Sequence, residues 1–257
     1  MTKIIFFGNG PLADYSKAIL EKNCEIVFHA RTKEDLTEVK RLKSADSSLH
    51  GVLASFGVMI KSDVLDLFEP EGILNIHPSL LPNYRGSSPI ETAILNGDKD
   101  FSYSIMKLVK AMDAGPTFHQ ATLDFPKNVE KAEIYKTIAE SAANWLVKNI
   151  KQLPTPVEQT GEPTFTVKFD KSMSALKPQE KSAETLLNEV RAFKGFPKSK
   201  YTFFGLDCII QKAHVSDIEE TKLSLKCSDN RYLIIDEIQP AGRKTMDAKS
   251  FLNGYAK

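Results

Sequence analysis

Residues 72–86 read GILNIHPSLLPNYRG, and this stretch decides the fold. Its first six residues are mostly apolar and lie between two prolines, Pro70 and Pro78, which is typical of a short buried strand. Side chains two positions apart on a strand face the same side, so Asn75 and His77 project together at its carboxyl end. We therefore place a functional site at that end of the strand.

Asn75 and His77 carry groups that suit acyl transfer. An amide N–H can hold a carbonyl oxygen, and an imidazole can take up or release a proton. Asp113, in the sequence MDAGP at 112–116, can orient such an imidazole and balance its charge. A single histidine is more often a hydrogen-bonded core residue, and the alternative for Asp113 is the cap of a loop. The three residues alone therefore leave the chemistry open.

Composition limits the function classes without choosing one. A chain of 257 residues with 42% hydrophobic content can bury a full core, and we expect two domains. No apolar run approaches the roughly 20 residues that cross a membrane, and residues 2–8 read as a first strand rather than a signal peptide. The three cysteines (Cys24, Cys208 and Cys227) are scattered, without the spacing of metal ligands. We expect a cytoplasmic monomer with reduced, packed cysteines and no metal.

The net charge of +1 is unevenly distributed. From Phe165 onward the chain carries 16 Lys and Arg against 12 Asp and Glu, whereas the part before it has an acidic excess. A mildly basic second half is compatible with nucleic acid as part of the substrate. An ordinary solvated surface would have the same composition.

The first part of the chain alternates strands and helices. This alternation predicts an open, mostly parallel, Rossmann-like α/β sheet, whose ligand site lies beyond the carboxyl ends of the strands. An apolar stripe at helical spacing predicts a core-facing helix after the last strand. The expected strands are 3–7, 25–29, 50–55, 72–77, 103–109 and 118–125, and the expected helices are 11–22, 32–43, 62–67, 88–96 and 130–150.

Prolines and a glycine at 154–163 interrupt both regular periods and indicate a linker. We therefore divide the chain into a catalytic domain at 1–153, a linker at 154–180 and a β-rich domain at 181–257. The β-rich domain is expected to contain a helix at 182–194 and short strands at 201–204, 206–213, 222–227 and 231–238. Several short strands after one helix favour a small OB-like barrel, a fold class that includes nucleic-acid-binding proteins.

Three motifs in order resemble the folate-dependent formyltransferases: N-I-H-P-S-L-L-P at 75–82, R-G-x-x-P-I at 85–90 and D-A-G-P at 113–116. These enzymes move a formyl group from 10-formyltetrahydrofolate to an amine. The segments at 191–197 and 238–246 resemble the second domain of the methionyl-tRNA formyltransferases, so the resemblance covers nearly the whole chain. It implies 10-formyltetrahydrofolate as the co-substrate and charged initiator tRNA as the acceptor.

One departure from this family keeps a second acceptor open. Methionyl-tRNA formyltransferases carry an Arg/Gly/Lys-rich loop after the second strand, which enters the acceptor-stem region of the tRNA. Here Phe28–Arg31 runs directly into a predicted helix, and that loop is missing. Sugar-nucleotide formyltransferases also carry a second domain of this kind. An amino-sugar nucleotide is therefore the alternative acceptor.

The resemblance also implies roles for individual residues. Asn75, His77 and Asp113 are implied to be catalytic, and Tyr84 and Arg85 to bind substrate. The folate is implied to lie among Phe56, Gly57, Val58, Met59, Val109, Lys110 and Met112, with Ser79, Leu80, Leu81 and Pro82 beneath its formyl end.

Several of these residues have a structural alternative. Leu80 and Leu81 would then pack beneath the strand and position Asn75 and His77, and Arg85 would form an internal ion pair that holds the loop at 79–86. The bond between Leu81 and Pro82 is a candidate cis peptide, because that conformation is largely confined to proline.

Two other classes of function fit parts of the sequence. The segment GNGPLA at 8–13 satisfies the G-x-G-x-x-A pattern after a first strand, and Arg31 could meet a 2′-phosphate, as in an NAD(P)-dependent oxidoreductase. A glycine turn that serves packing fits the same segment. A non-catalytic folate-binding or tRNA-binding protein would have lost part of the catalytic trio, and all three residues are present.

Overall fold

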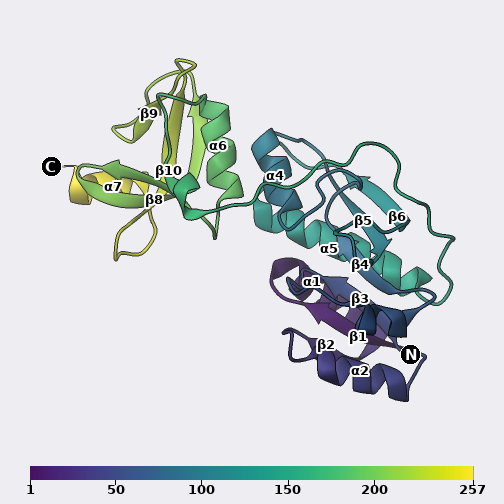
Figure 1. Ribbon diagram of the computed structural model, residues 1–257. Helices are drawn as coiled ribbons and strands as arrows, with labels where there is room; N and C mark the ends of the chain where they lie inside the picture. Colours follow the sequence, from purple (N-terminus) through teal and green to yellow (C-terminus); the bar gives the residue numbers. More distant parts are fainter. Residues whose placement is uncertain (257) are drawn as a thin grey trace. The chain divides into compact units, whose positions relative to one another are not determined.

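The structure, a computed structural model, describes residues 1–256, which form two compact units (Figure 1). The first unit contains residues 1–90 and 99–166, and the second contains residues 91–98 and the chain from Val167 onward. α4 (Pro89–Asn96) crosses this division. Among residues 1–256, none of the helices combines the length and apolar character needed to cross a membrane.

A six-stranded sheet forms the centre of the first unit, in the order β2-β1-β3-β4-β5-β6. The four strands from β2 to β4 pair in parallel, and β5 and β6 add to the β4 edge in antiparallel orientation. The predicted mostly parallel sheet is therefore confirmed. The strands are β1 (Thr2–Gly8), β2 (Cys24–Ala30), β3 (His50–Ala54), β4 (Ile73–His77), β5 (Phe101–Lys107) and β6 (Thr117–Leu123).

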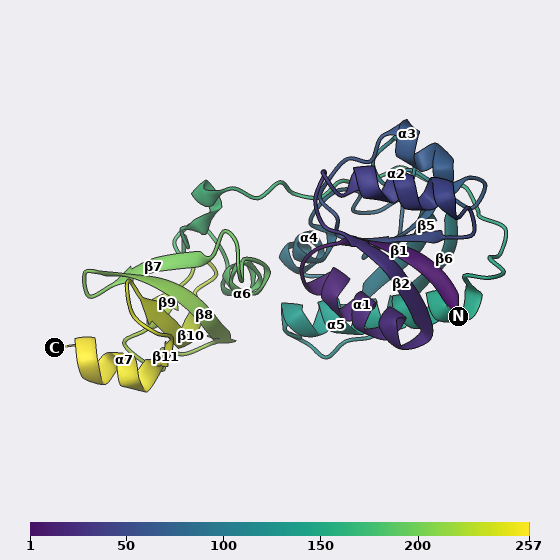
Figure 2. The same ribbon diagram turned by 90° about the horizontal axis from the view of Figure 1, so that it is seen from below.

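Helices cover both faces of this sheet (Figure 2). α1 and α5 pack together on one face, and α2, α3 and the short 3-10 helix η1 lie on the other. Residues 4–7 of β1 are all fully buried, because a strand with helices on both sides has no solvent face. The bounds are α1 (Pro11–Asn23), α2 (Leu36–Ala45), α3 (Ser62–Leu65), η1 (Asp66–Phe68) and α5 (Lys131–Asn149).

Four of the five residues in the apolar stripe predicted for α5 are fully buried, and the fifth, Trp145, is half-buried. The four are Ile134, Ile138, Ala142 and Leu146. By contrast, α2 begins at Leu36 and not at residue 32. The Asp35 carboxylate accepts hydrogen bonds from the backbone N–H groups of Arg31 (2.7 Å) and Thr32 (2.8 Å), so residues 31–35 form a turn before the helix. Local side-chain bonds of this kind compete with helix formation.

The second unit is built on an antiparallel sheet in the order β11-β10-β8-β7, with β9 paired to β10. Its core contains fully buried Leu186, Leu233 and Phe251. The bounds are η2 (Lys171–Ser174), α6 (Ala183–Ala192), β7 (Ser199–Phe203), β8 (Leu206–Ser216), β9 (Ser224–Lys226), β10 (Tyr232–Pro240), β11 (Met246–Asp247) and α7 (Ala248–Tyr255).

The sequence predicted no element after residue 238, yet β11 and α7 lie there. A recognisable signal was present, because the Asp247 carboxylate accepts a hydrogen bond of 2.7 Å from the backbone N–H of Ser250 and caps α7. An aspartate just before a helix is a common cap, because its carboxylate accepts a hydrogen bond from one of the unpaired backbone N–H groups of the first turn.

Candidate functional site

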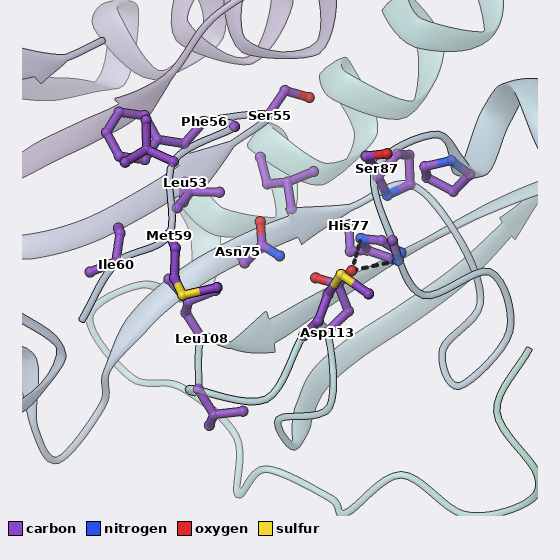
Figure 3. Close-up of a pocket in the computed structure, with 18 of the residues that line it drawn as sticks. Leu53, Ser55, Phe56, Met59, Ile60, Asn75, His77, Ser87, Leu108 and Asp113 are labelled. Atoms are coloured by element: carbon purple, nitrogen blue, oxygen red, sulfur yellow. Dashed lines mark hydrogen bonds and ion pairs between the residues drawn. The ribbon is translucent and has the colours of Figure 1, made fainter. Parts of the chain in front are cut away.

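Asn75 and His77 lie at the carboxyl end of β4, and both line one cavity (Figure 3). The two residues are almost fully buried, with 5% and 4% of their surface exposed. The cavity has a volume of about 580 Å³, which is large enough for a ligand of cofactor size. Its walls come mainly from the carboxyl ends of β3 and β4 and from the loops that follow β3, β4 and β5.

The two ring nitrogens of His77 have different surroundings. Nε2 lies 3.0 Å from the backbone carbonyl oxygen of Tyr84, so this nitrogen carries the hydrogen and donates it. Nδ1 lies 3.7 Å from a carboxylate oxygen of Asp113, which is too long for a hydrogen bond but close enough for a charge interaction (Figure 3).

This environment favours a neutral His77. Burial lowers the pKa of His77 below its usual value, and this effect outweighs the Asp113 charge and the Tyr84 hydrogen bond, both of which act to raise it. With its Nε2 hydrogen given to Tyr84, the neutral ring has a lone pair on Nδ1. His77 can therefore accept a proton at Nδ1, and Asp113 stabilises the charged ring that results.

Asp113 is held from the other side of the site. Its carboxylate accepts a hydrogen bond of 2.7 Å from the backbone N–H of Gly86, which joins the loop after β5 to the loop after β4. The backbone φ of Asp113 is 48°, in the left-handed region that non-glycine residues seldom adopt. Surrounding contacts must hold such a conformation. The carboxylate thus bonds a distant loop and does not cap its own.

The Asn75 amide is a free donor. Within residues 1–256, no hydrogen bond is formed by the Asn75 side chain, which lines the cavity although only 5% of the residue is exposed. The amide is not one of the fully enclosed polar groups that lack a partner, so it faces the open space of the cavity. A ligand oxygen in the cavity would satisfy this N–H, which is the geometry that carbonyl recognition requires.

Both segments expected to form the walls of a folate slot line the same cavity. The residues that the structure brings together there are Phe56, Gly57, Val58 and Met59 after β3, and Val109, Lys110 and Met112 after β5. The side chains of Met59 and Met112 are exposed, with 80% and 61% of their surface in contact with solvent. Lining residues that the sequence did not single out include Ser55, Ser87 and Tyr135.

The four residues expected beneath the formyl end are not brought to the cavity surface. They have the following surroundings: the Ser79 hydroxyl donates to the backbone oxygen of Asn83 (2.6 Å), Leu81 is buried, Leu80 is exposed, and Pro82 follows a cis peptide bond. The cis bond itself was predicted. Leu81 thus fits the packing alternative for this loop, whereas the exposed Leu80 does not. Direct folate contact by these residues stays a prediction.

Tyr84 and Arg85 also lie outside the cavity lining. Tyr84 contributes its backbone carbonyl to His77, whereas Arg85 directs Nε and Nη2 to the side-chain oxygen of Gln159, at 3.1 and 2.6 Å. The alternative of an internal contact for Arg85 is thus observed, but the partner is a neutral amide and not a carboxylate. No sequence signal distinguished Gln159, which lies among prolines and glycine in the segment expected to be a linker.

The glycine turn after β1 has a packing explanation. A Cβ atom on Gly8 would lie 2.0 Å from the backbone oxygen of Ala54 on β3, so only glycine fits there. The His29 side chain also donates from Nε2 to the Gly8 carbonyl oxygen at 2.9 Å. Close approach of β1 and β3 therefore accounts for Gly8, the first glycine of the pattern that suggested binding of a dinucleotide. Among residues 1–256, no three His, Cys, Asp or Glu side chains are grouped so that they could hold a metal ion.

Family models match both parts of the chain. Residues 13–150 match the model described as formyl transferase, and residues 168–256 match the model described as formyl transferase, C-terminal domain. The chain belongs to the formyl transferase family. The first match contains Asn75, His77 and Asp113, so it includes the whole cluster at the end of β4.

Relatives with curated names resemble this formyltransferase over most of its length. A methionyl-tRNA formyltransferase of Methylobacillus flagellatus is 34% identical over 218 residues, which is 79% of this chain and 70% of the relative. One of Mycoplasma genitalium is 27% identical over 259 residues, which is 94% of this chain and 81% of the relative. These matches extend well into the second unit.

A solved structure shares the fold. HypX from Aquifex aeolicus in complex with tetrahydrofolic acid aligns with a TM-score of 0.76 at 15% identity. The alignment covers 100% of this chain and 48% of HypX, so the formyltransferase spans about half the length of that protein. At this identity the likeness concerns the fold alone.

Proposed function

We propose that this formyltransferase moves the formyl group of 10-formyltetrahydrofolate to the amino group of methionyl-tRNA. The observation that carries the proposal is the convergence of Asn75, His77 and Asp113 at one apolar cavity in a chain of this family. An oxygen-binding amide, a neutral base and a supporting carboxylate are the groups that formyl transfer to an amine requires.

The amine nitrogen attacks the formyl carbon, and negative charge develops on the formyl oxygen. The Asn75 amide, which faces the cavity, donates a hydrogen bond to that oxygen. His77 takes the surplus proton of the attacking amine at Nδ1, and Asp113 stabilises the resulting imidazolium across 3.7 Å. The carbon–nitrogen bond to the folate then breaks, and a proton returns to the folate nitrogen. Water relays the protons over the longer distances.

The folate is proposed to lie between the segments at 56–59 and 109–112. The lining of this cavity is mostly apolar and suits the face of a pterin ring, and backbone groups of both segments can bond its edges. The two exposed methionines, Met59 and Met112, belong to these segments and would be covered by a bound folate. Methionine adapts its shape readily to a ligand surface.

The acceptor follows from the relatives and from the charge of the chain. Both named relatives are methionyl-tRNA formyltransferases, and the chain from Phe165 onward is mildly basic. An amino-sugar nucleotide is the second candidate, because residues 31–35 form a short turn where the tRNA-contacting loop would be. We also propose that the enzyme acts as a monomer, which sedimentation equilibrium tests.

The acceptor is tested by direct competition. Purified protein and 10-formyltetrahydrofolate are offered either charged initiator tRNA or a 4-amino-sugar nucleotide. We expect formylation of the tRNA, with a binding constant that falls steeply with salt, because many phosphates are neutralised. Transfer to the sugar and none to the tRNA would contradict the proposed acceptor and leave the chemistry intact.

The chemistry is tested by single substitutions. Asn75→Ala, His77→Ala and Asp113→Asn are each expected to lower kcat by roughly 10²–10³-fold, the loss typical of one well-placed donor or acid–base group. Asp124→Asn, the same change at an exposed site of the first unit, is the matched control for Asp113→Asn. Near wild-type turnover in His77→Ala would refute the mechanism.

A further inference from the structure

The Gln159 side chain makes four hydrogen bonds beside the site. Its Nε2 group donates to the backbone oxygens of Asp113 (2.8 Å) and Gly115 (2.7 Å), and its Oε1 accepts from Nε and Nη2 of Arg85 (3.1 and 2.6 Å). Both amide hydrogens and both oxygen lone pairs are used. The residues on either side of it, Glu158 and Thr160, are exposed, so only the Gln159 side chain reaches inward.

The segment at 157–166 does not need Gln159 for its attachment. At one end, Val157 and Thr117 exchange two backbone hydrogen bonds of 2.8 Å. At the other end, the Arg85 backbone bonds Thr164 and Thr166, each at 2.9 Å. Gln159 lies between these two anchors. Its side-chain bonds are therefore available for a different purpose, which is to join the two loops that carry the reacting groups.

These two loops meet at the site but come from different strands. The loop after β4 supplies the Tyr84 carbonyl to His77 and the Gly86 N–H to Asp113. The loop after β5 supplies Asp113 itself, in a left-handed backbone conformation that must be held by contacts. Gln159 binds the first loop through Arg85 and the second through the Asp113 and Gly115 carbonyls. A shift in either loop would change the distance between Asp113 and His77.

Glutamine is the only common side chain that fits this position. Two carbonyls require two donors, and the forked guanidinium of Arg85 requires an acceptor. Glutamate would satisfy Arg85 with an ion pair but would place an oxygen against the Asp113 and Gly115 carbonyls. Methionine has a similar length and satisfies neither side. These two substitutions therefore separate the contact with Arg85 from the contact with the Asp113 loop.

We propose that Gln159 is a positioning residue that sets the distance between Asp113 and His77, an inference that rests on the proposed chemistry of these two groups. It touches neither the cavity nor the reacting atoms. It acts by holding the Asp113 backbone, so that the carboxylate faces Nδ1 of His77 when that nitrogen becomes charged.

The kinetic test compares Gln159→Glu, Gln159→Met and the control Glu158→Gln, the isosteric change at the exposed neighbouring residue. We expect both Gln159 variants to lower kcat about 10- to 100-fold, as displacements near 1 Å of catalytic groups do, with an unchanged KM for 10-formyltetrahydrofolate. Glu158→Gln should equal the wild type. Wild-type kcat in Gln159→Glu would overturn the proposal, because the Arg85 contact alone would then suffice.

A second measurement needs no acceptor and so stands apart from the proposed function. The His77 pKa is followed by NMR of ¹³C-histidine-labelled protein, with His77→Asn to assign the signal. Since the Asp113 charge acts to raise that pKa, we expect it to fall in Gln159→Met, where the Asp113 backbone is no longer held and its carboxylate moves away from His77. A His77 pKa equal to that of the wild type would overturn the positioning role. A protein that formylates neither acceptor would contradict the proposed function while this titration still decides the role of Gln159.

Discussion

Adding one methyl group at Gly115 should disable the site without touching any reacting group. Gly115 lies two residues after Asp113, and its backbone packs against the end of β5. An alanine Cβ there would be 2.0 Å from the backbone oxygen of Lys107, although real Cβ atoms keep at least 3.0 Å. β5 lies between β4 and β6 and cannot easily move. The loop that carries Asp113 must therefore shift by about 1 Å.

The size of the effect follows from this shift. Misplacing a catalytic group by about 1 Å costs roughly 10²-fold in rate, which is about 2.7 kcal/mol of transition-state stabilisation. Gly115 does not line the cavity, so the methyl group itself does not obstruct the folate. We expect kcat to fall about 10²-fold in Gly115→Ala, with a smaller change in the KM for 10-formyltetrahydrofolate.

The assay is steady-state formylation, with thermal unfolding measured on the same preparations. Gly254→Ala is the matched control, because it adds the same methyl group in α7. Among residues 1–256, no atom other than those of its chain neighbours and the helix backbone lies within 4 Å of the new Cβ. If Gly115→Ala keeps a kcat within about twofold of Gly254→Ala while the protein stays folded, the position of the Asp113 loop does not limit the reaction and the reasoning is refuted.

Three further predictions concern stability and reactivity. Burial opposes a charged His214, but the hydrogen bonds and charges of Asp236 and then Glu220 outweigh it and raise the His214 pKa. His214→Gln should therefore lower the free energy of unfolding in urea by about 0.5 kcal/mol at low pH. This loss should vanish as the pH rises through the pKa of His214 in the folded protein. An equal cost at about pH 5 and pH 9 would contradict this. Burial raises the pKa of each cysteine thiol, so a thiol reagent should label the native protein far more slowly than the unfolded one: Cys24, Cys208 and Cys227. Ile138→Ala, in the buried stripe of α5, should lower the free energy of unfolding by about 2–5 kcal/mol. A loss under about 1 kcal/mol would show that the surrounding side chains close the cavity left by the substitution.

The parts of the fold that depend on short-range patterns could be predicted from the sequence. β4 was recognisable because an apolar run with prolines around it has few alternatives, and period-two alternation then placed Asn75 and His77 on one side. The core-facing side of α5 followed from helical spacing in the same way. The start of α2 was placed too early, since its periodicity continues across residues that the Asp35 side chain folds into a turn.

The connections between loops could not be predicted. Gln159 is 46 residues from Asp113 and 74 residues from Arg85 in the sequence, and its segment follows neither the helical nor the strand period. Contacts of this kind depend on the final position of irregular backbone, which leaves no repeating pattern to read. The motif resemblance implied the residues that we propose to react, but not the residue that joins their loops.

The groups proposed to act on the formyl carbon and the surface proposed to bind the acceptor also come from different parts of the chain. The groups proposed to act on the formyl carbon are built on β4 and on loops joined by the backbone N–H of Gly86 and by Gln159, so their geometry does not depend on what accepts the formyl group. Recognition of the acceptor must come from elsewhere in the chain. Residues 31–35 form a turn closed by Asp35, in the place where the tRNA-contacting loop of the family would be. For a tRNA acceptor, the phosphates then have to be neutralised chiefly by the basic excess that the chain carries from Phe165 onward. A sugar nucleotide has only two phosphates, so its binding would draw little on that excess and should depend only weakly on salt.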